Sequence, residues 1–162
     1  MTNRQFFLKC WQEEYPTFLK VLRALPADRL DYRPDPRSRS AGELVWLQVL
    51  EKRCWFELLE TGKINWKVTA PAGNLAEMLS AYEQAHQDLL PQLADVDDDS
   101  WDRRSTQFLI DGRVYIETTL GHMFWIGLFD AIHHRGQLTV YLRPMGGKVP
   151  SIYGPSADDP GL

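Results

Sequence analysis

Apolar residues recur at the spacing of an amphipathic helix over four long segments, and this repetition constrains the fold more than any other feature of the sequence. The predicted helices span residues 5–25, 41–61, 75–95 and 116–145. A helix with one apolar stripe has to bury that stripe against a partner. Four such helices, with long connections after the first and the second, therefore predict an all-α four-helix bundle.

Three of these helices carry recognisable end signals. Ser40 and Glu43 form the pattern of a capping box, in which each side chain can bond a backbone N–H of the other, so we expect a helix to begin at residue 41. Gly62 is a suitable residue to end that helix, and Asn74 can cap the third one. Pro16 interrupts the first helix and is expected to kink it or to mark the start of a shorter helix.

The connections are mostly irregular. Residues 63–73 have no period and are expected to form a loop, and the acidic run at residues 95–99 is expected to be a solvated turn. Asp111-Gly112 separates two short apolar runs, residues 108–110 and 114–116, which predicts a small hairpin.

After the last helix, residues 146–162 are rich in proline and glycine. The two glycines that begin this tail end the helix, and its prolines keep the remainder extended. Val149, Ile152 and Tyr153 offer apolar contacts with the bundle, so we expect the tail to be ordered to about Ser156.

Length and composition are those of an ordinary globular protein. The 162 residues, 44% hydrophobic and 25% charged, predict one domain over residues 1–162. A net charge of −4 disfavours nucleic acid as a partner, and no apolar run is long enough to predict a membrane span. Because the N-terminus lacks a signal-peptide pattern, we expect a cytoplasmic protein, in which Cys10 and Cys54 stay reduced.

Side chains that bind metals crowd into residues 128–138 of the last helix. Asp130 and His134 are four residues apart, so a carboxylate and an imidazole lie on the same helix face and can bind one divalent ion, Zn, Ni, Fe or Mn. These residues fall within a wide face that we expect to point inward, where a carboxylate needs a cation or a hydrogen-bond partner. Protein sites usually supply at least three ligands, so another helix has to contribute.

The remaining polar side chains of the helices give no clear third ligand. Gln48 and Glu51 lie at the margin of the apolar stripe of the second helix, and a solvated helix edge is the favoured interpretation for both. His86 falls on the buried side of the third helix, where a hydrogen-bonded core residue is more common than a ligand. His122 lies about 12 Å along the axis from Asp130, which argues against it.

Three segments of the chain resemble the DinB family of bacterial four-helix-bundle proteins. They are Arg39–Trp46, Ile132–Gln137 and Tyr141–Ser156. The resemblance implies a mononuclear divalent-metal site, often built from three histidines, one on the second helix and two on the last. His134 matches one of these histidines, Asp130 replaces another, and the second-helix position falls at Leu47, which cannot bind a metal. Gln48 is then the substitute on that helix, and His133 and Gln137 are expected to support the ligands.

Two functions follow from the resemblance. One is a metal-dependent enzyme acting on an unidentified small molecule, since some members of the family transfer low-molecular-weight thiols and others are hydrolase-like. The other is a non-catalytic bundle with a degenerate metal site, which dimerises or binds a small ligand. A homodimer is expected in either case, because symmetric pairs are the commonest oligomers.

Overall fold

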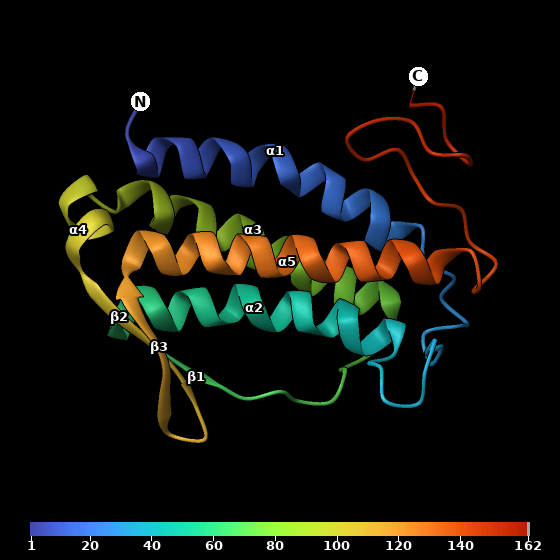
Figure 1. Ribbon diagram of the computed structural model, residues 1–162, viewed down its shortest axis with the longest axis horizontal. Coiled ribbons are helices and arrows are strands. Elements are labelled where there is room, and N and C mark those ends of the chain that lie inside the picture. The colour runs from blue at the N-terminus through green and yellow to red at the C-terminus, as the bar shows by residue number, and fades with distance from the viewer. Residues whose placement is uncertain (162) are drawn as a thin grey trace.

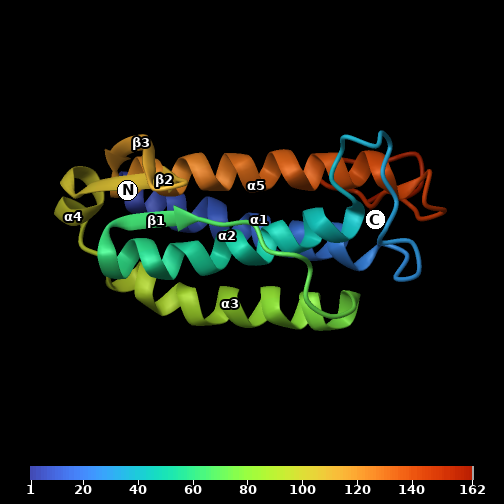
Figure 2. The ribbon, with the colours of Figure 1, turned by 90° about the horizontal axis from the view of Figure 1, so that it is seen from below.

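The computed structural model describes residues 1–161, and four long helices make up most of it (Figure 1). Leu162, the last residue of the predicted tail, lies outside the described residues. The long helices are α1 (Asn3–Arg23), α2 (Ala41–Thr61), α3 (Leu75–Asp95) and α5 (Leu120–Leu142). Helices α1 and α2 each pack against both α3 and α5, which lie on opposite sides of the bundle in Figure 2.

Capping boxes set the beginnings of three helices. Ser40 and Asn74 cap α2 and α3, and the helices predicted at residues 41–61 and 75–95 have these bounds in the structure. Helix α1 begins two residues before the predicted start because Thr2 forms a capping box with Gln5. Pro16 lies inside α1, which continues to Arg23.

A small three-stranded sheet shows that the all-α prediction was incomplete. The strands are β1 (Lys63–Trp66), β2 (Ser105–Ile110) and β3 (Arg113–Thr119), in the order β1-β2-β3. The predicted hairpin is confirmed: β2 and β3 pair antiparallel across Asp111 and Gly112, whose φ angles of 51° and 74° suit a tight hairpin turn.

Strand β1 was missed, because the expected loop at residues 63–73 begins with a strand that pairs parallel to β2. Its four residues place only Ile64 fully inside, so the segment is too short to show a period. The last helix begins at Leu120 rather than at the predicted residue 116, because residues 113–119 belong to β3.

The expected acidic turn connects α3 to a short helix, α4 (Asp98–Arg103), which begins within the acidic run and was not predicted. Asp97 caps α4, and this helix buries Trp101 to 1% exposure. The Trp101 ring stacks on Phe124 of α5 with the ring centroids 5.4 Å apart. The acidic residues therefore begin a helix that covers one end of the bundle.

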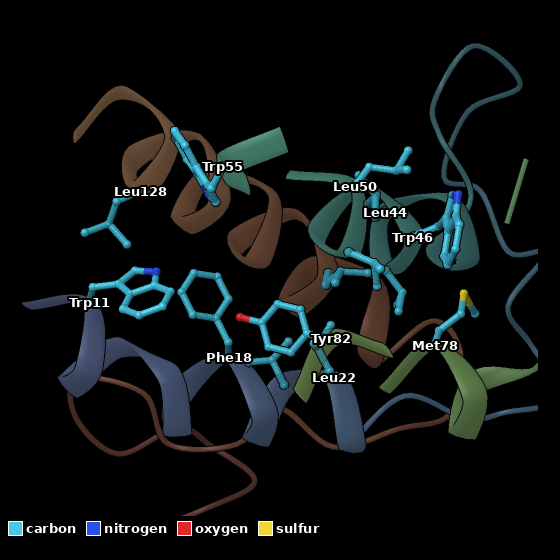
Figure 3. Packing of buried hydrophobic residues seen from close by; sticks show 14 of the residues in the cluster. Trp11, Phe18, Leu22, Leu44, Trp46, Leu50, Trp55, Met78, Tyr82 and Leu128 are labelled. Carbon is cyan, nitrogen blue, oxygen red and sulfur yellow. The ribbon is translucent and has the colours of Figure 1, made fainter. Parts of the chain in front are cut away.

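Aromatic residues fill much of the core. Figure 3 shows Trp11 and Phe18 of α1 on the same side of the core as Tyr82 of α3, with Trp55 of α2 on the opposite side. Gly127 of α5 faces Trp55 so closely that a Cβ atom there would lie 2.0 Å from the indole ring. A small residue at this position lets α2 and α5 approach each other.

The tail after α5 has no regular secondary structure, and side chains bind it to the bundle. The buried guanidinium of Arg135 pairs with Glu14 of α1 and donates a 2.5 Å hydrogen bond to the Tyr153 hydroxyl. That hydroxyl in turn donates to Glu14 at 2.8 Å. None of the helices within residues 1–161 is long and apolar enough to cross a membrane.

Candidate metal centre

Three acidic and imidazole side chains from α2 and α5 meet at one point. Glu51, Asp130 and His134 each direct one potential ligand atom so that all three atoms lie within 4.8 Å of one another. Nε2 of His134 lies 3.3 Å from Oδ2 of Asp130 and 3.9 Å from Oε1 of Glu51. Among the described residues this is the group of His, Cys, Asp and Glu side chains whose geometry could hold a metal ion.

Helix geometry explains how these residues meet. Asp130 and His134 are one turn apart on α5 and therefore share a face, as predicted. Glu51 lies in the middle of α2, and the contact between Gly127 and Trp55 brings the two helices close at this level. The triad is thus held by two long helices, which position side chains more rigidly than loops do.

Glu51 is the residue that the sequence did not identify. A solvated helix edge was favoured for both Glu51 and Gln48, and this prediction was wrong because their exposures are 9% and 2%. The signal that could have found Glu51 is its spacing from Leu47, the second-helix position implied by the resemblance. Residues four apart share a helix face, so a carboxylate one turn after Leu47 can approach the same site.

The surroundings of Oε1 of Glu51 indicate whether a cation fits this site. This atom is a fully buried side-chain oxygen with no hydrogen-bond partner among the described residues. An unpaired buried carboxylate oxygen is costly, and buried charges are normally paired or coordinate metals. A divalent ion between Glu51, Asp130 and His134 would satisfy this oxygen, so the donor set fits a metal.

The pKa values of the two carboxyl groups are shifted in opposite directions. Burial, followed by the charge of Asp130, raises the pKa of Glu51 well above its usual value. The hydrogen bond from His134 lowers the pKa of Asp130 below its usual value. Burial acts to lower the pKa of His134, but the hydrogen bonds to Asp130 and Gln137 outweigh it and the net pKa is raised.

Asp130 is less buried than its position in the apolar pattern suggests. The last helix was predicted to direct Asp130 inward, yet the Asp130 side chain is 54% exposed, and the nearby residues His133 and Val140 are exposed as well. The inward face is therefore narrower than predicted. Asp130 occupies the mouth of the site, whereas Glu51 and His134 lie deeper, with side chains 10% and 15% exposed.

Gln137 orients the His134 ring through a hydrogen bond. Oε1 of Gln137 lies 2.8 Å from Nδ1 of His134. Because a carboxamide oxygen can only accept, Nδ1 carries a proton in this bond and Nε2 faces the two carboxylates. This arrangement leaves the correct ring nitrogen available for a metal.

The remaining candidates lie elsewhere. Gln48 donates a 3.2 Å hydrogen bond from Nε2 to the carbonyl oxygen of Ala131, so it ties α2 to α5 and is not part of the triad. His133 is exposed next to His134, with the ring centroids 5.3 Å apart. His122 is exposed, and its Nδ1 lies 2.9 Å from the hydroxyl oxygen of Thr118. His86 is buried, and its Nδ1 lies 3.4 Å from Nζ of Lys52.

A cavity of about 290 Å³ opens beside the triad. Its walls come from α2, α5 and the three strands, and they are mainly aliphatic and aromatic. Cys54 lines it, but burial raises the pKa of its thiol to about 12, so the thiol stays protonated near neutral pH. The reactive groups of this cavity are therefore the triad residues.

The fold and the triad together define a helical-bundle protein with a candidate metal centre between its second and last long helices. The model of the DinB family matches residues 1–160 of the chain. The chain belongs to the DinB family, and the resemblance noted in its sequence is confirmed.

The similarity to known proteins extends over nearly the whole chain. The uncharacterised protein YrdA of Bacillus subtilis (strain 168) is 26% identical over 159 residues, which cover 94% of this chain and 89% of that protein. The crystal structure of a DinB-like protein from Bacillus cereus ATCC 10987 matches with a TM-score of 0.75 at 21% identity, covering 91% of this chain and 95% of that one. The crystal structure of the DinB-like protein YjoA from Bacillus subtilis matches with a TM-score of 0.66 at 18% identity, covering 88% and 92%.

Proposed function

We propose that this protein is a metal-dependent enzyme of hydrolase type, in which Glu51, Asp130 and His134 hold one divalent ion. The observation that carries the proposal is the unpaired buried oxygen of Glu51, which faces a carboxylate and an imidazole from α5. A third ligand from α2 replaces the one that Leu47 cannot supply. The site then has three protein ligands, the number that is usual in catalytic metal centres.

The donor set favours particular ions. Two carboxylates and one imidazole supply mostly oxygen, which suits Mn²⁺ and Fe²⁺ better than a set of three histidines would. Zn²⁺ and Ni²⁺ also accept this combination and follow in our order of preference. We therefore propose Mn²⁺ or Fe²⁺ as the resident ion.

Each residue has a distinct task in this proposal. A bound divalent ion supplies Lewis acidity toward a polar group of the substrate. Glu51 anchors the ion from the buried side, and His134 is held in register by Gln137. Asp130, at the exposed mouth, would hold the ion from the side where a substrate enters.

Elemental analysis of protein purified without an affinity tag tests the proposal. We expect close to one equivalent of a first-row divalent metal, falling below about a tenth of an equivalent in Glu51→Gln and in His134→Gln. His133→Gln is the matched control because this exposed neighbour lies outside the triad, and it should retain the metal. Metal-free wild-type protein that also fails to bind added Mn²⁺, Fe²⁺ or Zn²⁺ would refute the metal centre.

A non-catalytic bundle is the second candidate function, and one observation favours it. Burial raises the pKa of Glu51, so a protonated Glu51 could share its proton with Asp130, which lies next to His134. The triad would then be a hydrogen-bond network with no ion. The same elemental analysis separates the two functions, because the network requires no metal.

A further inference from the structure

The cavity beside the triad has a strongly unequal distribution of polar groups. Its apolar wall includes Trp66 of β1, Phe108 of β2 and Ile116 of β3, with Trp55 of α2 beside them. At about 290 Å³ it lies at the lower end of the volumes of small-molecule sites, about 300–1,000 Å³. A compact ligand with an apolar body is therefore the kind that this cavity can enclose.

The lining residues of α5 give the cavity a direction. Met123, Ile126, Asp130 and His134 follow one another along α5, and they span about 16 Å at 1.5 Å per residue. The apolar end lies where α5 meets the strands, and the triad lies further along the helix. A ligand that begins at the strands therefore passes the triad before it reaches the far end.

Arg39 marks that far end. Its backbone oxygen accepts a 3.1 Å hydrogen bond from the hydroxyl of Tyr141, which lies two turns beyond His134, and Arg39 is one of the residues that line the cavity. Within residues 1–161 the Arg39 guanidinium makes no ion pair or hydrogen bond with another side chain, whereas the nearby Arg33 and Arg37 pair with Glu43 and Asp35. Arg39 is thus an exposed cation, without a side-chain partner among residues 1–161, at one end of an apolar cavity.

Charge then selects the ligand. With a divalent ion bound, the charges of Glu51 and Asp130 cancel that of the ion, and Arg39 leaves a surplus of one positive charge. A planar guanidinium pairs best with a planar carboxylate, and a single surplus charge matches a monoanion better than a dianion.

We infer that the cavity binds a monocarboxylate with a compact apolar chain, its carboxylate at Arg39 and its chain directed past the triad toward β1–β3. The inference rests on the proposed metal centre in two respects: the charge balance that favours a monoanion counts the bound ion, and such a molecule would be the substrate or product of that site. The features that carry it are the apolar wall, its direction along α5 and the unpaired Arg39.

Binding of straight-chain carboxylates to the Mn²⁺-loaded and the metal-free protein tests the apolar part. Butyrate, hexanoate and octanoate are titrated while tryptophan fluorescence is recorded, since Trp55 and Trp66 line the cavity. Each added methylene should tighten binding about fourfold until the cavity is filled. Affinity that does not depend on chain length would overturn the inference.

Head-group analogues and one pair of variants test the ionic part. Octanoate should bind the Mn²⁺-loaded protein about tenfold more tightly than octan-1-ol or dianionic octyl phosphate. Arg39→Gln should remove this preference and leave the metal content unchanged. Arg37→Gln, at a 92% exposed arginine of the same loop that lies outside the cavity lining, should keep it.

Equal affinity for octanoate and octan-1-ol, or equal effects of the two arginine variants, would overturn the role of Arg39. Metal content is measured separately from ligand binding, so the two proposals can fail independently. A protein that holds no metal but binds octanoate through Arg39 refutes the proposed enzyme and keeps the ligand class. A protein that holds metal but binds none of the carboxylates at millimolar concentration keeps the proposed enzyme and refutes the ligand class.

Discussion

At the scale of single residues, Glu51 shows how a site can cost stability. Its buried oxygen has no partner in the described part of the chain, and leaving such a group unsatisfied costs about 1–3 kcal/mol. Glu51→Met, which keeps the volume and removes the polar atoms, should therefore raise the free energy of unfolding of the metal-free protein by about that amount. Urea unfolding in the presence of a chelator measures it.

The same variant should lose the extra stability that Mn²⁺ gives to the wild type, because a ligand that binds only the folded state stabilises it. If Glu51→Met destabilises the chelated protein instead, Glu51 makes a stabilising hydrogen bond and the network without an ion is the better description.

Leu47 tests the register of α2 against α5. It lies one turn before Glu51, is 3% exposed and lines the same cavity. Leu47→His should add a ligand to the site and tighten Zn²⁺ binding about tenfold or more, measured by competition with a chromogenic chelator. Unchanged affinity would mean that this position points past the ion, and Leu47→Gln serves as the control for lost packing.

His86 is the residue whose protonation should make stability depend on pH. Burial, with the nearby charge of Lys52, lowers its pKa to about 3, and its ring is stacked 3.5 Å from that of Tyr15. The unfolded chain takes up a proton near pH 6.5 that the folded chain rejects, so stability falls as the pH drops from about 6.5 toward 3. Between pH 7 and pH 5.5, the free energy of unfolding of His86→Phe should therefore fall by about 1 kcal/mol less than that of the wild type.

Chemical unfolding at the two pH values measures this difference, and His122→Gln, at an exposed ring, should follow the wild type. Parallel pH profiles for His86→Phe and the wild type would show that His86 becomes protonated in the folded protein.

Sequence reasoning at this scale succeeded where spacing alone decides the geometry and failed where burial decides it. Asp130 and His134 meet because residues four apart on a helix share a face. Whether Glu51 is solvated or buried depends on how closely α5 approaches α2, which no local pattern encodes. The exposure of Asp130 was misjudged for the same reason.

At the scale of elements, the close approach of α2 and α5 depends on Gly127. A Cβ atom there would lie 2.0 Å from the Trp55 ring, so Gly127→Ala should separate the helices or displace the indole. We expect a loss of about 1–3 kcal/mol in the free energy of unfolding, as for other overpacked cores, together with weaker metal binding. Urea unfolding and metal titration check both effects.

Gly136→Ala on the same helix is the matched control, because a Cβ atom there meets nothing within 4 Å. Replacing this helical glycine should stabilise the protein by about 0.5–1 kcal/mol. Equal effects of the two substitutions would show that close packing at Gly127 is unimportant.

The elements that were predicted correctly have strong local signals, and those that were missed do not. The capping box at Ser40, the cap at Asn74 and long apolar stripes identified α2 and α3, and the Asp111-Gly112 turn identified the hairpin. Strand β1 exists because β2 offers an edge to pair with, a long-range effect that four residues cannot signal. The strands in turn shortened α5 at its start and built one wall of the cavity.

At the scale of the whole molecule, the homodimer expected from the sequence remains a prediction, and the surface of α1 and α5 is where it can be tested. Phe6 and Phe129 are 45% and 60% exposed, and each ring lies within 6 Å of that of Trp125, with centroid distances of 5.8 and 5.6 Å. Val140 continues the exposed apolar line along α5 at 69% exposure. We propose that a second copy covers this aromatic patch, because its exposed side chains are apolar and a symmetric contact would remove them from water in both copies.

Sedimentation velocity should then show a dimer at micromolar concentration, and Phe129→Glu should convert it to a monomer by placing two carboxylates in the apolar contact. Val114→Glu, at a residue of β3 that is 50% exposed and remote from the patch, should remain dimeric. A wild-type protein that stays monomeric at 100 micromolar would refute the dimer. Because Phe129 directly precedes Asp130, a dimer formed here would also bring the second copy next to the exposed mouth of the triad. Phe129→Glu should then change the access of carboxylates to the cavity. Val114→Glu should leave that access unchanged.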